Sequence, residues 1–362
     1  MEGLMANFYK GKNVLVTGHS GFKGTWLCRV LTLMGAKVSG YSLAPLSSPN
    51  LFELINISND MNSVFADIRD LENLKQTFAA LKPEIVFHLA AQPLVRRSYQ
   101  EPVETYQTNV LGTVNVLEAI RFCPSVKSFL NVTTDKVYKN IENQNKGYKE
   151  TDELDGYDPY SNSKSCSELV TSSYKKSFFN EADVRISTAR SGNVLGGGDF
   201  APDRIIADAV RAIKDSKTLI LRNPNSVRPY QHVAEAIFMY LLIAQKQFEN
   251  SKYADCYNIG PDISDCLKTQ QLIERFYNYF KDAKWEIQID KNAPHEANFL
   301  MLDNTKIKKV FKWLPTIKID QAIEYSAQWT KEFLQGGNFA KTMDDQIFKT
   351  YKKYQDIEEK LL

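Results

Sequence analysis

The first half of the chain repeats one pattern, in which a short apolar segment is followed by a longer segment with helical spacing. Short apolar strands that alternate with helices indicate a parallel sheet covered on both faces. The sequence therefore predicts an α/β fold with a doubly wound parallel sheet. The expected strands are NVLVTG (13–18), KVSGYSL (37–43), NSVFADI (62–68), EIVFHLAA (84–91), KSFLNVTT (127–134) and DVRISTARSG (183–192).

After about residue 192 the alternation of strands and helices gives way to longer loops. The segment GNVLGGGDFAPDR, rich in glycine, opens this region. We expect residues 1–191 to form the first domain, with a return segment near 229–250. Residues 192–345 mainly form a smaller C-terminal, substrate-binding domain, and 346–362 form a C-terminal helix.

Two later segments have the spacing of buried helices. AIFMYLLIA (236–244) is about half as long as a membrane span requires, so we expect a helix in the core. The tail places apolar side chains on one helical face, which packs against this chain or against a second copy. These side chains are Ile347, Tyr351, Tyr354, Ile357 and Leu361.

Charge and cysteine usage exclude several classes of function. The net charge of +2 balances 45 basic against 43 acidic residues, which gives no electrostatic reason to expect nucleic acid or a membrane as partner. The five cysteines are scattered and the four histidines do not cluster. We therefore expect reduced thiols, no metal site and a cytoplasmic location.

A glycine turn joins the first expected strand to the first expected helix. In VLVTGHSGFKGTWL, Gly18 permits a tight turn, Gly21 lets a pyrophosphate approach the backbone, and Gly24 lets helix and strand pack closely. Because the turn follows the first strand of an alternating chain, it predicts dinucleotide binding and a Rossmann-type fold.

A tyrosine and a lysine stand four residues apart in DPYSNSKSCSEL. Tyr160 and Lys164 therefore lie on one helix face, and an ammonium near a phenol lowers the pKa of that phenol toward the working range. Such a tyrosine can remove a hydroxyl proton while a nicotinamide takes the hydride. The spacing alone is common, but here it follows a glycine turn and a strand that ends at Thr134, whose hydroxyl would bind the substrate oxygen.

The order of these motifs resembles the extended short-chain dehydrogenase/reductase superfamily. The resemblance rests on TGHSGFKG, ADIRD, HLAAQ and NVLGTVNVLEA, and it implies NAD as cofactor. KVSGYSL ends without the acid that NAD enzymes place on the ribose, so NADP stays open. The implied cofactor-binding residues are Gly18, Gly21, Phe22, Lys23, Gly24, Asp67, Ile68, Leu89, Ala90, Ala91, Thr133, Tyr160 and Lys164.

Within this superfamily, TTDKVY closely resembles the CDP-glucose 4,6-dehydratases. TGHSGFKGTWL, AAQPLVRRSY, VRPYQHV and PHEANFLMLDNTK agree with that family in sequence order. The resemblance implies a lyase that oxidises C4 of CDP-glucose, removes the C5 proton, expels the C6 hydroxyl and returns the hydride to C6. It also implies a homodimer and a place in deoxysugar synthesis for surface polysaccharide such as O-antigen.

By this resemblance Asp135 is the general acid for the departing C6 hydroxyl, and Lys136 occupies the position of the C5 base. A lysine acts as a base only if its pKa is lowered by desolvation or by a nearby cation. Otherwise Lys136 stabilises the enolate, and Tyr160 or water takes the proton. A strand-end ion pair without a catalytic role is the remaining reading of this stretch.

The same resemblance points to substrate contacts downstream of the sheet. Arg204 and Arg228 are candidates for the diphosphate, because a guanidinium pairs with phosphate oxygens through two parallel hydrogen bonds. The full set of expected substrate-binding residues is Gln92, Asn193, Arg204, Arg228, His295 and Glu296.

Three other functions stay open as alternatives to a CDP-glucose 4,6-dehydratase. They are a nucleotide-sugar epimerase, a dehydratase of a dTDP-, UDP- or GDP-sugar, and a non-catalytic dinucleotide-binding regulator.

Overall fold

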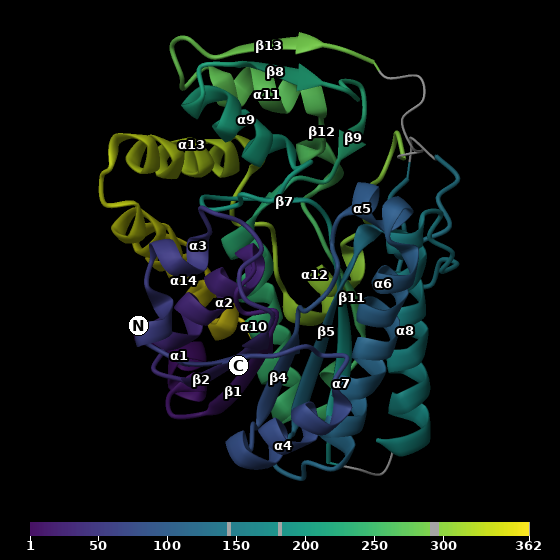
Figure 1. Ribbon diagram of the computed structural model, residues 1–362. Helices are drawn as coiled ribbons and strands as arrows, with labels where there is room; N and C mark the ends of the chain where they lie inside the picture. Colours follow the sequence, from purple (N-terminus) through teal and green to yellow (C-terminus); the bar gives the residue numbers. More distant parts are fainter. Residues whose placement is uncertain (143–145, 180–182, 290–296, 362) are drawn as a thin grey trace.

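The centre of the protein is a seven-stranded parallel sheet (Figure 1). The computed structural model describes residues 1–142, 146–179, 183–289 and 297–361. The strand order is β11-β6-β5-β4-β1-β2-β3, so the predicted doubly wound α/β fold is confirmed. The strands are β1 Asn13–Thr17, β2 Lys37–Ser42, β3 Asn62–Phe65, β4 Ile85–His88, β5 Ser128–Thr134, β6 Arg185–Ser191 and β11 Cys256–Ile259.

Helices cover both faces of this sheet. Along β1, Val14 and Val16 face a core shared with α2 and α10, whereas Leu15 faces a second core shared with α4 and α7. This alternation follows from the two-residue period of a strand. The covering helices are α2 Phe22–Leu33 and α10 Val233–Glu249 on one face, and α4 Leu71–Leu81, α7 Gly112–Arg121 and α8 Pro159–Phe178 on the other.

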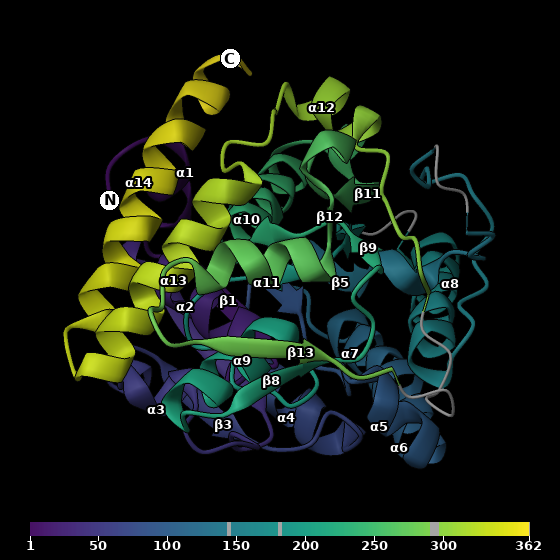
Figure 2. The same cartoon turned by 90° about the horizontal axis from the view of Figure 1, so that it is seen from above.

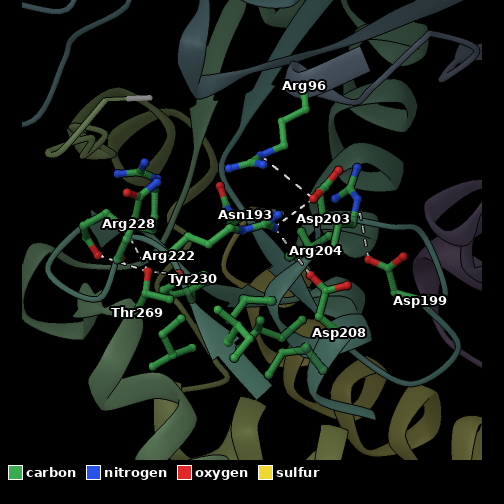
Figure 3. Close-up of a pocket in the computed structure, with 18 residues that line it drawn as sticks. Arg96, Asn193, Asp199, Asp203, Arg204, Asp208, Arg222, Arg228, Tyr230 and Thr269 are labelled. Carbon is green, nitrogen blue, oxygen red and sulfur yellow. Dashed lines mark hydrogen bonds and ion pairs between the residues drawn. The ribbon is translucent and has the colours of Figure 1, made fainter. Parts of the chain in front are cut away.

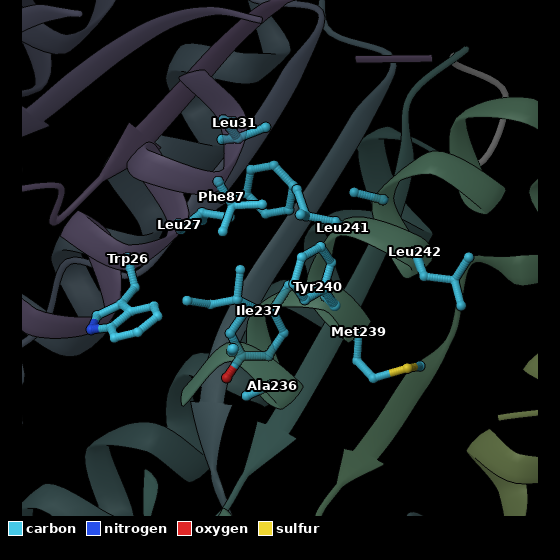
Figure 4. Packing of buried hydrophobic residues seen from close by; sticks show 14 of the residues in the cluster. Trp26, Leu27, Leu31, Phe87, Ala236, Ile237, Met239, Tyr240, Leu241 and Leu242 are labelled. Carbon is cyan, nitrogen blue, oxygen red and sulfur yellow. The ribbon is translucent and has the colours of Figure 1, made fainter. Parts of the chain in front are cut away.

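Helix α10 is the buried helix that the sequence predicts around 236–244. Every residue from Val233 to Ala244 is buried, because α10 packs on β5 and β6 of the sheet, beside α2, and also contacts the C-terminal helix. Figure 4 shows its side chains beside Trp26 and Leu31 of α2 and Phe87 of β4. No helix among the described residues has the length and hydropathy of a membrane span.

A smaller lobe lies above the carboxyl ends of the strands (Figures 1 and 2). Its apolar side chains form a separate cluster from α9, β8, α11 and the first half of α13. The division of the chain at residues 191 and 345 stays a prediction. The elements of this lobe are β7 Val194–Leu195, α9 Ile205–Lys214, β8 Thr218–Leu221, β9 Val227–Arg228, β10 Gln231–His232, β12 Leu267–Lys268, α11 Thr269–Tyr277, β13 Lys284–Ile287 and α13 Ile319–Gln335. Helix α12 Thr305–Phe311 instead packs beside β11 in the main core.

The remaining helices pack mainly against the helices already described. They are α1 Leu4–Tyr9, α3 Leu51–Leu54, α5 Val95–Gln100, α6 Pro102–Tyr106 and α14 Phe339–Glu359, together with a π-helical turn at Gln107–Leu111 and a 3₁₀ turn at Asp135–Val137. The spacing of apolar residues in NVLGTVNVLEAIRFC (109–123) predicts one helix. The structure divides it into the π-helical turn and α7.

The C-terminal helix α14 packs against this chain. It begins at Phe339, earlier than the expected residue 346, because Met343 also lies in the core. The expected apolar face is buried in the main cluster, with Leu361 partly buried beside it. Two backbone amides of α1 donate to α14, Met5 N to Glu358 Oε2 (3.2 Å) and Ala6 N to Tyr351 Oη (3.1 Å).

This contact predicts a pH-dependent stability. Burial raises the pKa of Glu358 to about 7, so between about pH 4.5 and 7 the folded state binds more protons than the unfolded state. Stability therefore falls as pH rises through this window, by at most about 3 kcal/mol. Glu358→Gln should be more stable than wild type at pH 8 and equal to it at pH 4.5. Urea unfolding at both pH values measures this, and an equal change at both would contradict it.

Candidate active site

The glycine turn after β1 has the shape that a dinucleotide requires. Gly18 has φ of 77°, and a Cβ on it would lie 2.7 Å from Ala90 N. A Cβ on Gly24 would overlap the Gly18 carbonyl, so helix α2 packs directly on the turn. Over Gly21 the nearest atom to an added Cβ is 3.4 Å away. The turn is thus open to a ligand at Gly21, and it fits the pyrophosphate of a dinucleotide.

The other expected cofactor residues lie at neighbouring strand ends. Leu89 N donates to Thr17 O (3.1 Å) and Ala90 N donates to Thr17 Oγ1 (3.2 Å), which ties the end of β4 to the glycine turn. Ala91 follows them. Beyond β3, the Asp67 carboxylate accepts from Arg69, which lowers the pKa of Asp67. Ile68 is buried against Gly112.

Helix α8 carries the tyrosine and the lysine into the site. Asp158 caps the helix by accepting from Ser161 N (2.9 Å). This starts α8 so that Tyr160 and Lys164 are one turn apart and both buried. Lys164 Nζ donates to Val132 O of β5 (3.1 Å), and burial lowers the pKa of Lys164 to about 8. The ammonium is therefore held against the strand that ends at Thr134.

The pKa of Tyr160 moves in the opposite direction from the sequence-based expectation. Burial raises this pKa to about 12, and the hydrogen bond with Thr134 and the charge of Arg204 offset only part of the rise. The expectation that Lys164 lowers it toward the working range is wrong for the free protein. The cause is desolvation of the phenolate, which residue spacing does not reveal.

The stretch Thr134-Asp135-Lys136 forms a buried polar cluster at the end of β5. Thr134 Oγ1 donates to Asp135 Oδ1 (3.0 Å), and Lys136 Nζ donates to the same oxygen (2.9 Å) and to Asn193 Oδ1 (3.2 Å). Asp135 has no exposed surface, and its Oδ2 has no hydrogen-bond partner among the described residues. The ion pair is therefore not part of a solvated surface turn.

Lys23 links the glycine turn to this cluster. Burial and the charges of Arg204, Lys164 and Lys136 lower the pKa of Lys23 to about 7, while the charge of Asp135 raises it. Lys23 therefore lies within electrostatic reach of all four groups. The expected cofactor region and the expected catalytic residues thus share one continuous site.

A polar pocket adjoins this site on the side of the smaller lobe (Figure 3). Arg222 crosses it, and its Nη2 lies 2.8 Å from Asp203 Oδ1. Arg96 Nε is 3.9 Å from the same oxygen, and Arg204 Nε is 3.7 Å from Asp199 Oδ2. The walls also carry apolar side chains from β7, α9 and β8. Such a pocket can hold an anionic group and a flat ring.

The pocket brings together three of the six expected substrate residues, Asn193, Arg204 and Arg228. Arg228 donates to the carbonyls of Val227, Ala297 and Asn298. Gln92 is not part of it, because both ends of its amide hydrogen-bond within the loop before α5 and with Thr105. His295 and Glu296 lie outside the described residues.

Five charged side chains of this pocket were not predicted from the sequence, Arg96, Asp199, Asp203, Asp208 and Arg222. Arg96 lies within AAQPLVRRSY, one of the motifs that carry the family resemblance, so this motif is the signal in the sequence that could have indicated Arg96. Arg222 follows β8 at the far end of the smaller lobe, and no local pattern marks it. Within the described ranges, no group of three or more His, Cys, Asp or Glu side chains could hold a metal ion.

The fold, the glycine turn and the buried tyrosine–lysine pair define a class, the extended short-chain dehydrogenase/reductases. Solved structures of this class resemble the chain throughout. A UDP-glucose 4-epimerase of Thermus thermophilus, in complex with NAD, aligns with a TM-score of 0.76 and 23% identity over 88% of this chain and 98% of that one. A dTDP-glucose 4,6-dehydratase of Bacillus anthracis, in complex with NAD, aligns with a TM-score of 0.72 and 22% identity over 89% and 97%.

Sequence comparison gives the family. A family model described as GDP-mannose 4,6 dehydratase matches residues 15–325. The chain is 44% identical over 337 residues to a CDP-glucose 4,6-dehydratase of Salmonella typhimurium, covering 91% of this chain and 93% of that protein. A probable dTDP-glucose 4,6-dehydratase of Sinorhizobium fredii is 26% identical over 92% and 96%. The chain belongs to this family of nucleotide-sugar 4,6-dehydratases, as its motifs predict.

Proposed function

We propose that the protein converts CDP-D-glucose to CDP-4-dehydro-6-deoxy-D-glucose and water. The observation that carries the proposal is the buried Asp135 at the end of β5, whose Oδ1 accepts from Thr134 while Oδ2 has no hydrogen-bond partner among the described residues. An epimerase needs no such acid. The 44% identity with the CDP-glucose 4,6-dehydratase of Salmonella typhimurium supports the choice of nucleotide.

The cofactor of this reaction is NAD, in agreement with the complexes of the structural relatives. The glycine turn would hold its pyrophosphate, since Gly21 is open and the first turn of α2 points its amide groups there. Asp67, Ile68 and Leu89 to Ala91 complete the proposed site. When bound, NAD supplies a reversible hydride acceptor, so the reaction has no net redox change.

Proton transfer at C4 is assigned to Tyr160. Its phenolate oxygen would take the proton of the C4 hydroxyl while Thr134 hydrogen-bonds the same substrate oxygen. The Lys164 ammonium, held on Val132 O, stabilises the phenolate electrostatically. Because the pKa of Tyr160 is about 12 in the free protein, this positive charge is needed for the tyrosine to act near neutral pH.

Loss of water at C5 and C6 is assigned to Asp135 and Lys136. Asp135 Oδ2 would deliver the proton to the departing C6 hydroxyl. The hydrogen bonds of Lys136 to Asp135 and Asn193 favour stabilisation of the C4 enolate over proton abstraction, because Nζ already donates to two acceptors. In that arrangement water removes the C5 proton, or Tyr160 removes it after passing the proton of the C4 hydroxyl on to water.

The arginine pocket is assigned to the nucleotide. Arg96, Arg204 and Arg222 would contact the diphosphate, which replaces Asp199 and Asp203 as their partner. The apolar walls would enclose the base.

We also propose a homodimer in the cytoplasm, formed through α6, α7 and α8. Its support is the exposed apolar surface there, with Val103 68% and Leu169 56% exposed.

A panel of nucleotide sugars tests the proposal. The purified protein with NAD is incubated with CDP-, dTDP-, UDP- and GDP-glucose and with GDP-mannose. Formation of a 4-keto-6-deoxy sugar is followed by the absorbance that such sugars develop in alkali. We expect product from CDP-glucose at a kcat/KM at least about tenfold above the others. Product from another nucleotide alone, or C4 epimerisation with the C6 hydroxyl retained, would overturn the assignment.

A further inference from the structure

The stripe of α8 that bears Tyr160 and Lys164 continues to a third ionisable side chain. Glu168 lies one turn beyond Lys164, at positions i, i+4 and i+8 of one helix face. Glu168 is 4% exposed, so its charge lies in the interior and not on a solvated helix face. A buried carboxylate is costly unless it is hydrogen-bonded and paired.

Both oxygens of Glu168 bind strand residues at the site. Oε1 accepts from Thr133 Oγ1 of β5 (2.5 Å), directly before Thr134. Oε2 accepts from Thr188 Oγ1 (2.7 Å) and from Arg190 Nη2 (3.0 Å), both of β6. One carboxylate thus joins α8 to two strands. They are β5, which ends at Thr134, and β6, which ends shortly before Asn193.

Arg190 fixes the far side of this network. Its Nη1 donates to Tyr138 Oη (2.8 Å) and to Glu150 O (3.0 Å), and its guanidinium lies 5.1 Å from the centre of the Tyr138 ring. Tyr138 follows the turn that contains Asp135 and Lys136. The Glu168–Arg190 pair therefore holds the segments before and after the catalytic turn.

Among the described residues, Glu168 is also the acid whose charge acts on Lys164. His88 of β4 and Lys23 of α2 face the ammonium as well. Burial keeps His88 neutral because it lowers the pKa of that ring to about 3, and Lys23, whose pKa is about 7, adds positive charge only below that pH. The Glu168 carboxylate opposes the effect of burial and raises the pKa of Lys164.

We propose that Glu168 is a positioning residue that holds Lys164 charged and keeps α8 in register with the ends of β5 and β6. It does not touch the substrate. The inference rests on the proposed function of Tyr160 and Lys164, and it assigns a role that the motif around them does not contain.

Removal of the carboxylate charge tests the inference through the pH profile. In Glu168→Gln the loss of the Lys164 proton occurs at lower pH, so the alkaline limb of kcat/KM moves down by about one pH unit. Activity at pH 8 falls several-fold and returns close to the wild-type value at pH 6.5. A purely structural defect would lower the whole profile without moving its limb.

A second variant is needed in case Glu168→Gln does not fold, since that substitution leaves the buried Arg190 without its ion-pair partner. The double variant Glu168→Gln/Arg190→Met removes both charges, which buried pairs often tolerate. It should show the same displaced limb. Glu235→Gln is the matched control. That carboxylate is equally buried, but its partners Trp313, Thr316 and Tyr354 lie outside the site, so its limb should stay in place.

The outcomes separate this inference from the proposed function. If the wild-type enzyme forms no 4-keto-6-deoxy product, the proposed function fails. If it does, and the folded double variant keeps the wild-type limb, the role of Glu168 is overturned. A limb that also moves in Glu235→Gln overturns it as well, since the shift would then follow from reduced stability alone.

Discussion

Replacement of Asp135 by asparagine should lower the rate of dehydration by a factor of about 10²–10⁴, the usual contribution of a general acid. Asparagine keeps the shape of the side chain, and its carbonyl can still accept from Thr134 and Lys136. It cannot deliver a proton to the C6 hydroxyl. The first half-reaction at C4 does not use Asp135, so the variant should still oxidise CDP-glucose and accumulate reduced cofactor.

The measurement follows two signals in one experiment. The absorbance of reduced cofactor reports oxidation at C4, and the alkali-induced absorbance reports the 4-keto-6-deoxy product. Asp183→Asn is the matched control, because Asp183 is exposed and lies before the amino end of β6, away from the site. Unchanged product formation in Asp135→Asn would contradict the role of Asp135. The pair of Asp135 and Lys136 would then be a structural ion pair without a catalytic role.

The sequence predicted those parts of the fold that depend on local patterns. Six strands and their covering helices follow from alternating and helical periodicity, and Gly18 and Gly24 are needed where the backbone approaches another segment closely. Strand β11, at the edge of the sheet, was missed. It is a short segment, Cys256–Ile259, and it pairs with β6 only after the chain has passed through the smaller lobe.

The sequence was less informative about properties that depend on burial and on distant contacts. Spacing places Tyr160 and Lys164 on one face, but only the fold shows that desolvation raises the pKa of that tyrosine. Arg222 and Asp203 meet across the pocket although each lies in a different loop. Glu168 is on the same stripe as the catalytic pair, yet its partners Thr133 and Arg190 come from two strands.

Replacement of Tyr160 by phenylalanine should abolish the first step instead of the second. The ring is retained, and only the oxygen that would take the proton of the C4 hydroxyl is lost. We expect a fall of about 10²–10⁴ in kcat/KM. In contrast to Asp135→Asn, reduced cofactor should not accumulate, because hydride leaves C4 only as the hydroxyl proton is removed. Rapid mixing of the NAD-loaded variant with CDP-glucose measures this difference.

Two controls isolate the hydroxyl from general effects of the substitution. Tyr157→Phe removes a hydroxyl from a side chain that is 75% exposed and precedes α8, and it should keep wild-type activity. Thermal unfolding should show that Tyr160→Phe differs from wild type by about 1 kcal/mol or less, since one hydrogen bond with Thr134 is lost. If reduced cofactor still formed at the wild-type rate, Tyr160 would not be the C4 base. Lys164, whose pKa is about 8, would then be the nearest alternative on the same helix face.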